Sequence, residues 1–286
     1  MPSVDRVPFT VSHIAAVLPL RRSGLPFAAL AAGSIAPDLP YFLPLLSRLG
    51  AHSGVTHSRV GVLTADVALG LATWMVWRAM ALPLHDLAPH AVRTRWQPWA
   101  RPAAHAPQVL LAVAVGAATH VGWDEFTHQG RFGARHIAAL AELHPALPGD
   151  LPGYQYAQFV SSIVGLALLA WIASRRSVVA CPPRLAPTLA TALPWLLGAG
   201  AAIGALIRSA DLTGSPSVRT VAFYMITSTM SGAAAAGGLT CAVWWARTRT
   251  RRRPQKEPTT VPTPKVTAMP TAPTSTLRST ARNGGA

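Results

Sequence analysis

Long apolar runs separated by short polar segments dominate this chain of 286 residues. A membrane-spanning helix needs roughly 20 apolar residues to cross a hydrocarbon layer of about 30 Å. Runs of about this length lie at 60–82, 107–128, 156–174, 187–207 and 218–245. Inside a bilayer the backbone polar groups must bond within their own segment, so runs of this kind predict helices. The pattern therefore predicts an all-α fold, a polytopic transmembrane helix bundle.

Two shorter apolar runs precede these, at 9–20 and 25–36, and they flank an Arg-Arg-Ser-Gly turn. Each would be about 18 Å long as a helix, so neither crosses a bilayer by itself. The second crosses only if it continues past Pro37, Pro40 and Pro44, which interrupt regular helix. The sequence therefore predicts short, broken N-terminal helices and about six spans in all.

The composition changes after residue 246, where apolar runs give way to Arg, Pro, Thr and Ser. Segments of this kind bury too little apolar surface to offset the entropy of ordering the chain. We expect a single integral membrane domain at 1–246 and a basic, disordered tail at 247–286. Within the membrane domain, Gly and Ala in the run at 187–207 favour close helix packing.

Charge is scarce and unevenly placed. Half of the residues are hydrophobic and 12% are charged, with a formal net charge of +15. Nine of the 25 Lys and Arg residues follow residue 246, and most others form short clusters between apolar runs. This is the distribution that holds loops on the cytoplasmic side of a membrane, so we expect the lipid bilayer as a partner and no nucleic acid. Cys181 and Cys241 stand alone, which argues against a zinc–thiolate site.

Loop charge also predicts an orientation. The segments 83–106, 175–186 and the tail are basic and are expected to be cytoplasmic, whereas 129–155 and the segment around 211 carry balanced charge. The protein is thus expected to be a multi-pass protein of the cell membrane, either an inner or a plasma membrane. Trp244 and Trp245 would anchor the last span at the interface. In this orientation, the C-terminal end of the run at 107–128 lies on the outer side of the membrane.

Three ligand-type residues mark that outer end. His120, Asp124 and His128 are four residues apart, so a helix presents them on nearly the same face. Imidazole and carboxylate donors suit a divalent metal, above all zinc, with manganese or iron as alternatives. Zinc lowers the pKa of a bound water to about 7 and so supplies a nucleophile for hydrolysis. Glu125 is a candidate base.

Other ionisable residues interrupt the apolar runs, where such groups are costly and imply a function or a partner. His13, Asp38 and His57 reach the outer side if the first two runs form a hairpin with its Arg-Arg turn on the inner side. Asp66 is expected to pair with an Arg or a backbone group. Each residue also has a structural alternative, a helix–helix hydrogen bond for His13 and a turn or cap for Asp38 and His57. Candidate hydrogen-bond partners for the histidines are Ser12 and Ser58.

The segments PFTVSHIAAVLPL, GSIAPDLPYFL, THSRVG and ATHVGWDEFTHQGRF, in this order, resemble a bacterial integral membrane protein family known only as a domain of unknown function. They are more distantly similar to membrane-bound metal-dependent hydrolases and zinc-dependent phospholipase C-like proteins. The resemblance covers about residues 7 to 170. It implies metal ligands at His13, Asp38, His57, His120 and Asp124, with His128 inside the longer DEFTH match.

The sequence departs from the hydrolase pattern at two places. Pro40 stands where the relatives commonly have a second acidic residue, and His52 lacks the Arg that follows the corresponding histidine in the relatives. The expected function is a membrane-embedded metal-dependent hydrolase of a phosphoester or lipid-like substrate. Two alternatives stay open: a non-catalytic membrane protein with a structural polar or metal centre, and a cation or proton transporter, although no internal repeat is evident. The oligomeric state is left open.

Overall fold

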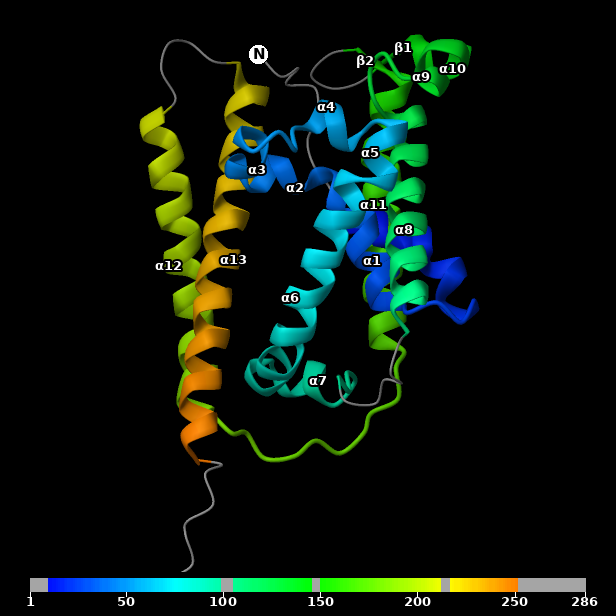
Figure 1. Ribbon diagram of the computed structural model, residues 1–286. Helices are drawn as coiled ribbons and strands as arrows, with labels where there is room; N and C mark the ends of the chain where they lie inside the picture. The colour runs from blue at the N-terminus through cyan, green and yellow to red at the C-terminus, as the bar shows by residue number, and fades with distance from the viewer. Residues whose placement is uncertain (1–9, 99–104, 146–149, 212–216, 252–286) are drawn as a thin grey trace, which may run out of the picture. The chain divides into compact units, whose positions relative to one another are not determined.

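The computed structural model describes residues 10–98, 105–145, 150–211 and 217–251 (Figure 1). The predicted all-α class is confirmed, because helices make up nearly all of the regular structure in these residues. A single antiparallel pair joins the short strands β1 (Leu143–His144) and β2 (Leu151–Pro152). The helices are η1 (Thr10–Arg22), α1 (Phe27–Ile35), η2 (Ala36–Asp38), α2 (Leu39–Phe42), α3 (Pro44–Arg48), α4 (Ser53–Thr56), α5 (Arg59–Leu63), α6 (Ala65–Leu87), α7 (His90–Arg93), α8 (Ala106–Thr127), α9 (Phe132–His136), α10 (Ala138–Ala141), α11 (Gly153–Ser174), α12 (Pro187–Asp211) and α13 (Val218–Arg251).

Four of the described helices are long and apolar enough to cross a membrane. They are α6, α11, α12 and the combined segment of α8 and α9. These four match four of the five long runs in the sequence. The fifth run lies in α13, which is long but contains many Gly, Ser and Thr residues and falls outside this set. The expected number of about six spans is therefore not confirmed, whereas four membrane-compatible helices are present.

The N-terminal runs form the short, broken elements that their length and prolines predict. The 3-10 helix η1 and the nine-residue α1 are joined through Gly24, whose φ of 82° is easy only for glycine. The chain after α1 then breaks into η2, α2 and α3, each beginning at or next to a proline. The hairpin formed by η1 and α1 brings Asp38 back to the end of the molecule where His13 lies.

The main core lies where η1, α1 and α8 meet. Gly33 of α1 packs on the backbone of Val113, and Gly116 of α8 packs on the carbonyl of Leu30, at distances that leave no room for a Cβ atom on either glycine. The two helices therefore approach backbone to backbone, as small residues permit in membrane proteins. The buried core side chains around this contact are Val17, Ala29, Leu30, Val109, Ala112 and Val113.

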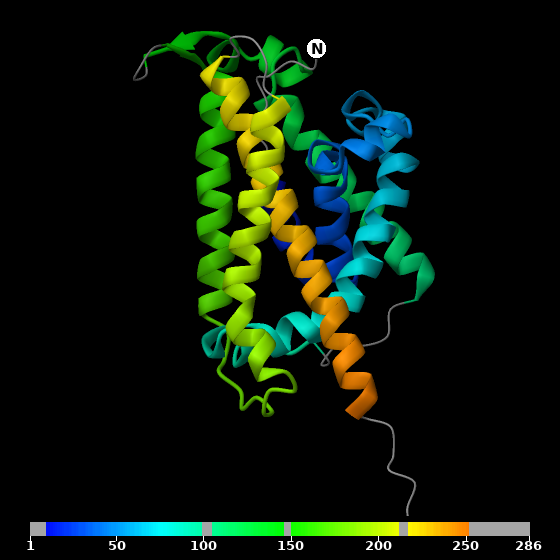
Figure 2. The same cartoon turned by 90° about the vertical axis from the view of Figure 1, so that its left-hand side faces the viewer.

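A second unit of packing is the hairpin of α12 and α13, which run side by side in both views (Figures 1 and 2). A Cβ atom on Gly200 or Gly232 would collide with the backbone of the facing helix, and one on Gly204 would collide with the carbonyl of Ser228. The close packing expected for the run at 187–207 is thus present.

The far end of the α12–α13 hairpin is fixed to α6 through Asp86. Its carboxylate accepts hydrogen bonds from the Leu185 and Ala186 amides, at 2.8 and 3.0 Å, and from Nε1 of Trp244, at 2.8 Å. Trp244 is 1% exposed, so it is a buried packing residue and not the interfacial anchor expected from sequence. Helix α13 continues to Arg251, past the expected domain boundary at 246, and the rest of the tail at 252–286 lies outside the described residues.

Candidate metal centre

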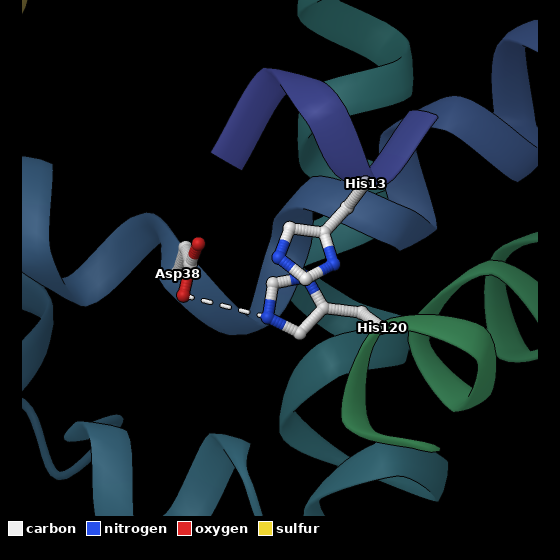
Figure 3. Close-up of side chains that lie close together, drawn as sticks. All are labelled: His13, Asp38 and His120. Atoms are coloured by element: carbon white, nitrogen blue, oxygen red, sulfur yellow. Dashed lines mark ion pairs between the residues drawn. The ribbon is translucent and has the colours of Figure 1, made fainter. Parts of the chain in front are cut away.

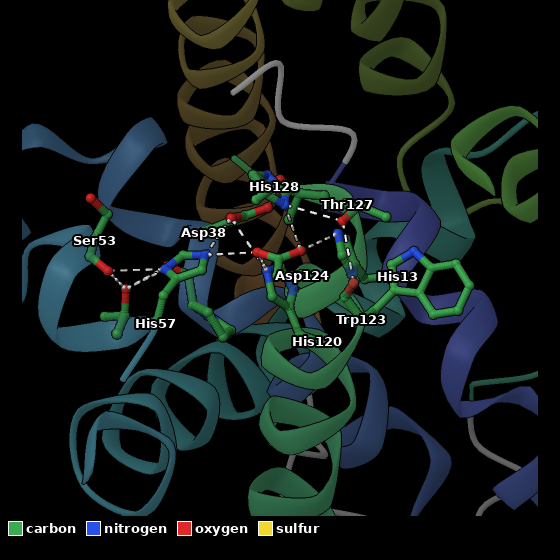
Figure 4. A network of polar contacts seen from close by, with 12 residues as sticks. His13, Asp38, Ser53, His57, His120, Trp123, Asp124, Thr127 and His128 are labelled. Carbon is green, nitrogen blue, oxygen red and sulfur yellow. Dashed lines mark hydrogen bonds and ion pairs between the residues drawn. The ribbon is translucent and has the colours of Figure 1, made fainter. Parts of the chain in front are cut away.

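The structure brings together all six ligand candidates from four separate segments (Figure 4). His13 comes from η1, Asp38 ends η2, and His57 follows α4. His120 and Asp124 lie one turn apart on the buried face of α8, and His128 caps the end of that helix. The predicted stripe is thus helical up to Thr127, while His128 has extended backbone with φ −127° and ψ 143°.

Two imidazole nitrogens and two carboxylate oxygens lie close to one another in this cluster. Nε2 of His57 lies 3.4 Å from Oδ1 of Asp38 and 3.3 Å from Oδ2 of Asp124. Nε2 of His120 lies 3.5 Å from each of the same two oxygens. Ligands at about 2.0–2.1 Å from a tetrahedral zinc are about 3.3–3.4 Å from one another. The four measured separations fit that spacing.

Hydrogen bonds to the other ring nitrogens point both imidazoles at the centre. Nδ1 of His120 donates to the Ser34 carbonyl across 2.7 Å, and Nδ1 of His57 lies 3.1 Å from the Ser53 carbonyl. A carbonyl oxygen only accepts, so Nδ1 carries a hydrogen in both rings, and Nε2 keeps its lone pair in the neutral form of each ring. This is the tautomer that metal-ligating histidines use, with a backbone partner behind the ring.

The remaining two histidines face Asp124 from the less buried side of the cluster. Oδ1 of Asp124 lies 3.8 Å from Nε2 of His13 and 3.3 Å from Nδ1 of His128. The His13 and His120 rings are stacked, with centroids 3.8 Å apart and planes 20° apart (Figure 3). Nε2 of His128 lies 3.4 Å from the amide nitrogen of Gln158, which donates, and Nδ1 of His128 lies 3.1 Å from the Thr127 hydroxyl.

Burial makes this arrangement costly unless its charges are balanced. His120 is fully buried and Asp124 is 1% exposed. Among the described residues, Nε2 of His120 and Oδ1 of Asp124 have no hydrogen-bond partner. Buried polar atoms are nearly always bonded, and buried charges are paired or coordinate metals. Two carboxylates and two oriented imidazoles are the donor chemistry that a divalent cation satisfies.

The ionisation of the residues outside the membrane-compatible helices agrees with that donor chemistry. Burial, together with neighbouring His120, lowers the pKa of His13 to about 4, so the ring is neutral at pH 7. Burial alone would raise the pKa of Asp38, but His120 and His57 hold the pKa of its carboxyl well below the usual range. Burial alone would lower the pKa of His57, yet hydrogen bonds to Asp124 and Asp38 raise the pKa of this ring above 6.5. His57 is therefore the position where a proton and a cation compete.

Other residues singled out in the sequence lie elsewhere. The Glu125 carboxylate lies 3.3 Å from Nη1 of Arg131 and accepts from the Phe132 amide at 2.9 Å, so it closes the turn after α8. The Ser58 hydroxyl caps α5 by accepting from the Gly61 amide, at 2.9 Å, and is not the partner of His57. Asp66 is fully buried, and neither of its oxygens has a hydrogen-bond partner among the described residues, contrary to the pairing expected for it.

Sequence reasoning missed the groups that hold the ligands in place. The Thr10 hydroxyl donates to Oδ2 of Asp38 across 2.6 Å, and the carbonyls of Ser34 and Ser53 anchor the two imidazoles. Thr10 precedes His13 by three residues, and side chains three apart share one face of a 3-10 helix, so a 3-10 assignment would have placed Thr10 in the site. The contacts with the backbone carbonyls cannot be predicted from side-chain identity, because every residue has a carbonyl.

Comparison with known proteins connects the site to a family. No curated protein and no solved structure matches this chain. A family model matches residues 7–246, a range that includes all six residues of the cluster and ends within α13. The chain belongs to the family described as a domain of unknown function (DUF4184).

Proposed function

We propose that this protein is a membrane-embedded metal-dependent hydrolase that acts on a phosphoester or lipid-like substrate. The observation that carries the proposal is the convergence of His57, His120, Asp38 and Asp124 with donor separations of 3.3–3.5 Å. The mixed nitrogen and oxygen donors favour zinc, with manganese or iron as alternatives. When bound, such an ion supplies Lewis-acid activation of a water and of a phosphoryl oxygen.

The cluster favours one ion over two. Within the described part of the chain, two groups of three donors could hold a metal ion: His13, Asp38 and His120, and His57, His120 and Asp124. Both groups use His120, whose Nδ1 is already hydrogen-bonded to Ser34. Its Nε2 has a single lone pair and serves one ion at a time. We therefore assign the ion to His57, His120, Asp38 and Asp124, and leave His13 and His128 beside it.

His13 and His128 are the residues that suit proton transfer. Both lie against Oδ1 of Asp124, and their side chains are 11% and 12% exposed, compared with 0–3% for His57 and His120. In this proposal the neutral ring of His13 accepts a proton at Nε2, and His128 holds Asp124 in place through Nδ1. Positioned general acid–base groups contribute about 10²–10⁴-fold to rates.

A structural metal centre is the second candidate, and one observation favours it. The two histidines and two aspartates would supply four protein ligands, whereas catalytic zinc sites usually have three protein ligands and an open position. A hydrolase needs one carboxylate to yield its place to water or to a fifth ligand. The spare imidazoles beside Asp124 favour the hydrolase, since a structural site has no use for them.

The decisive experiment measures metal and activity in the same detergent-purified samples. The wild type is compared with Asp124→Asn, His13→Gln and the control His136→Ala, which changes an exposed histidine stacked on Phe132. We expect about one zinc per chain in the wild type, in His13→Gln and in the control, and loss of zinc in Asp124→Asn. His13→Gln should also lose about 10²-fold or more in hydrolysis of phospholipid and soluble phosphoester substrates.

Two results would decide against the hydrolase. Folded wild-type protein without any divalent metal overturns the metal centre itself. Stoichiometric zinc without hydrolysis of any substrate class supports the structural centre instead.

We also propose that the protein is a multi-pass protein of the cell membrane, with its C-terminal tail in the cytoplasm. Four membrane-compatible helices and the basic clusters at 175–184 and 247–253 support this orientation. Cysteine accessibility at position 136, on the metal-centre side, compared with position 176 tests it. Labelling of position 176 by an impermeant reagent from outside intact cells contradicts the proposal.

A further inference from the structure

A cavity of about 1080 Å³ lies between the α12–α13 hairpin and the segment α2–α4. Ligand pockets in proteins are typically about 300–1,000 Å³, so this space is large enough for an extended organic molecule. The hairpin is attached to the rest of the chain through Trp244 near one end of α13 and, near the middle of α13, through the Ser231 hydroxyl, which donates to the Phe42 carbonyl. Ser231 and Phe42 themselves line the cavity, which continues past them to Phe223 and Tyr224.

The cavity is polar at one end and apolar at the other. Helices α12 and α13 are antiparallel, and Arg208 lies over Tyr224 at one end of the cavity while Gly200 contacts Gly232 further along. Beyond that point the lining consists of small and aliphatic residues such as Leu196 and Leu239. Leu196 and Arg208 are twelve residues apart, so the lining extends about 18 Å along α12.

Charge also distinguishes the two ends. The lining residues in the described part of the chain include no Asp or Glu, and Arg208 is the one Arg or Lys among them. Its guanidinium carbon lies 3.8 Å from the centroid of the Tyr224 ring. Arg is the residue best suited to bind a phosphate group, because its planar fork of donors matches the oxygens. The polar end of the cavity therefore complements an acidic group.

The apolar wall is open to the outside. Ile203 and Leu239 line the cavity yet remain 57% and 70% exposed. Both sit in the long hairpin, whose α12 is one of the membrane-compatible helices. Since such a helix contacts lipid tails, an acyl chain has a lateral entrance to the cavity.

The polar end also adjoins the metal centre. Tyr41 lines the cavity, and its ring centroid lies 6.1 Å from that of His57. Ser53 lines the cavity too, and its carbonyl bonds to Nδ1 of His57. The wall that separates cavity from cluster is thus the same short segment that orients a ligand residue.

We propose that this cavity binds one anionic phospholipid, with an acyl chain along Leu196, Ile203 and Leu239 and the phosphate at Arg208. The bound lipid would then present its headgroup phosphoester on the side of the metal centre. The role of this lipid as substrate rests on the proposed function, but its binding does not.

The test measures binding of phosphatidylglycerol and of phosphatidylcholine to the purified protein in detergent micelles by native mass spectrometry. The variants are Arg208→Gln, Arg208→Lys and Ile203→Trp, with Arg175→Gln as the matched control, because Arg175 also lies over an aromatic ring but outside the cavity. We expect Arg208→Gln to weaken phosphatidylglycerol about tenfold, the effect of one charged hydrogen bond. Arg208→Lys should retain most of the preference, and Ile203→Trp should weaken both lipids.

The outcomes separate this proposal from the hydrolase. Equal binding of the two lipids to the wild type, or equal phosphatidylglycerol binding by Arg208→Gln and Arg175→Gln, overturns the lipid site. Competition by inorganic phosphate alone at the same concentration points to a free anion and overturns it as well. Selective binding without hydrolysis leaves the lipid site standing and contradicts only the catalytic proposal. Unchanged zinc content in Arg208→Gln shows that the fold of the centre is intact.

Discussion

The Thr10 hydroxyl donates to Oδ2 of Asp38 across 2.6 Å, and both groups are buried. This bond leaves Oδ1 of the carboxylate directed at His57 and His120. Thr10 therefore positions one donor of the proposed metal centre. Outer partners of metal ligands typically contribute about 10–100-fold to metal affinity.

Replacing Thr10 with Val is expected to weaken zinc binding by about 10–100-fold, because the variant keeps the shape of the side chain but removes the donor. Thr10→Ser keeps the hydroxyl and should retain most of the affinity. Competition with a chelator of known affinity measures both. Thr64→Val, which removes an exposed hydroxyl bonded to the Val60 carbonyl, is the control. Equal affinities for the two Val variants would show that Thr10 has no such role.

Zinc binding is expected to release protons and to strengthen as the pH rises. The pKa of His57 is raised above 6.5 by its hydrogen bonds to Asp124 and Asp38, so this ring carries a proton near neutral pH that a cation must displace. His13, with a pKa of about 4, and Asp38, with a pKa well below its usual range, hold no exchangeable proton there. Affinity should rise about tenfold per pH unit for each proton released, from pH 6.5 up to the raised pKa of His57.

Titration calorimetry in two buffers of different ionisation enthalpy counts the protons released by zinc. Release of at least one proton at neutral pH agrees with displacement from His57. No release, together with an affinity that does not change with pH, would contradict the assignment of His57 as a ligand.

Gly116→Ala is expected to destabilise the protein and reduce its zinc content. A Cβ atom at position 116 meets the Leu30 carbonyl, so α1 has to move away from α8 and takes the Ser34 carbonyl away from His120. Overpacking of this kind costs about 1–3 kcal/mol. Gly122→Ala is a matched control on the same helix, because a Cβ atom there meets nothing within 4 Å. Thermal unfolding in detergent and metal analysis check both variants, and equal results for the two would refute the close contact as the cause.

Much of the site could be predicted from the sequence because it depends on local spacing. The four-residue interval between His120 and Asp124 places both on one face whatever the helix packs against. Ionisable residues in apolar runs also stand out, since burying them is costly, and this directed attention to His13, Asp38 and His57. The N-terminal hairpin followed from run length and proline positions, and it is the feature that returns Asp38 to His13.

Other features depended on contacts between segments and could not be read from spacing. Glu125 follows Asp124 directly, yet it turns to Arg131 and Phe132, because neighbouring residues on a helix point in different directions. Trp244 precedes a run of arginines and resembles an interfacial anchor, but the buried carboxylate of Asp86, far away in the chain, holds its indole. A span at α13 is not confirmed, because hydroxyl and glycine residues dilute the apolar character of this helix.

The sequence by itself determined the helical class, four of the membrane-compatible helices and the set of six ligand candidates, because each depends on hydrophobic run length or on helical periodicity. Only the tertiary structure decided which atoms of those candidates face one another. That choice depends on backbone carbonyls at Ser34 and Ser53, on the hydroxyl of Thr10 and on the glycines that let α1 reach α8. Backbone carbonyls are the same in every residue, so no side-chain pattern can mark the ones that orient a histidine.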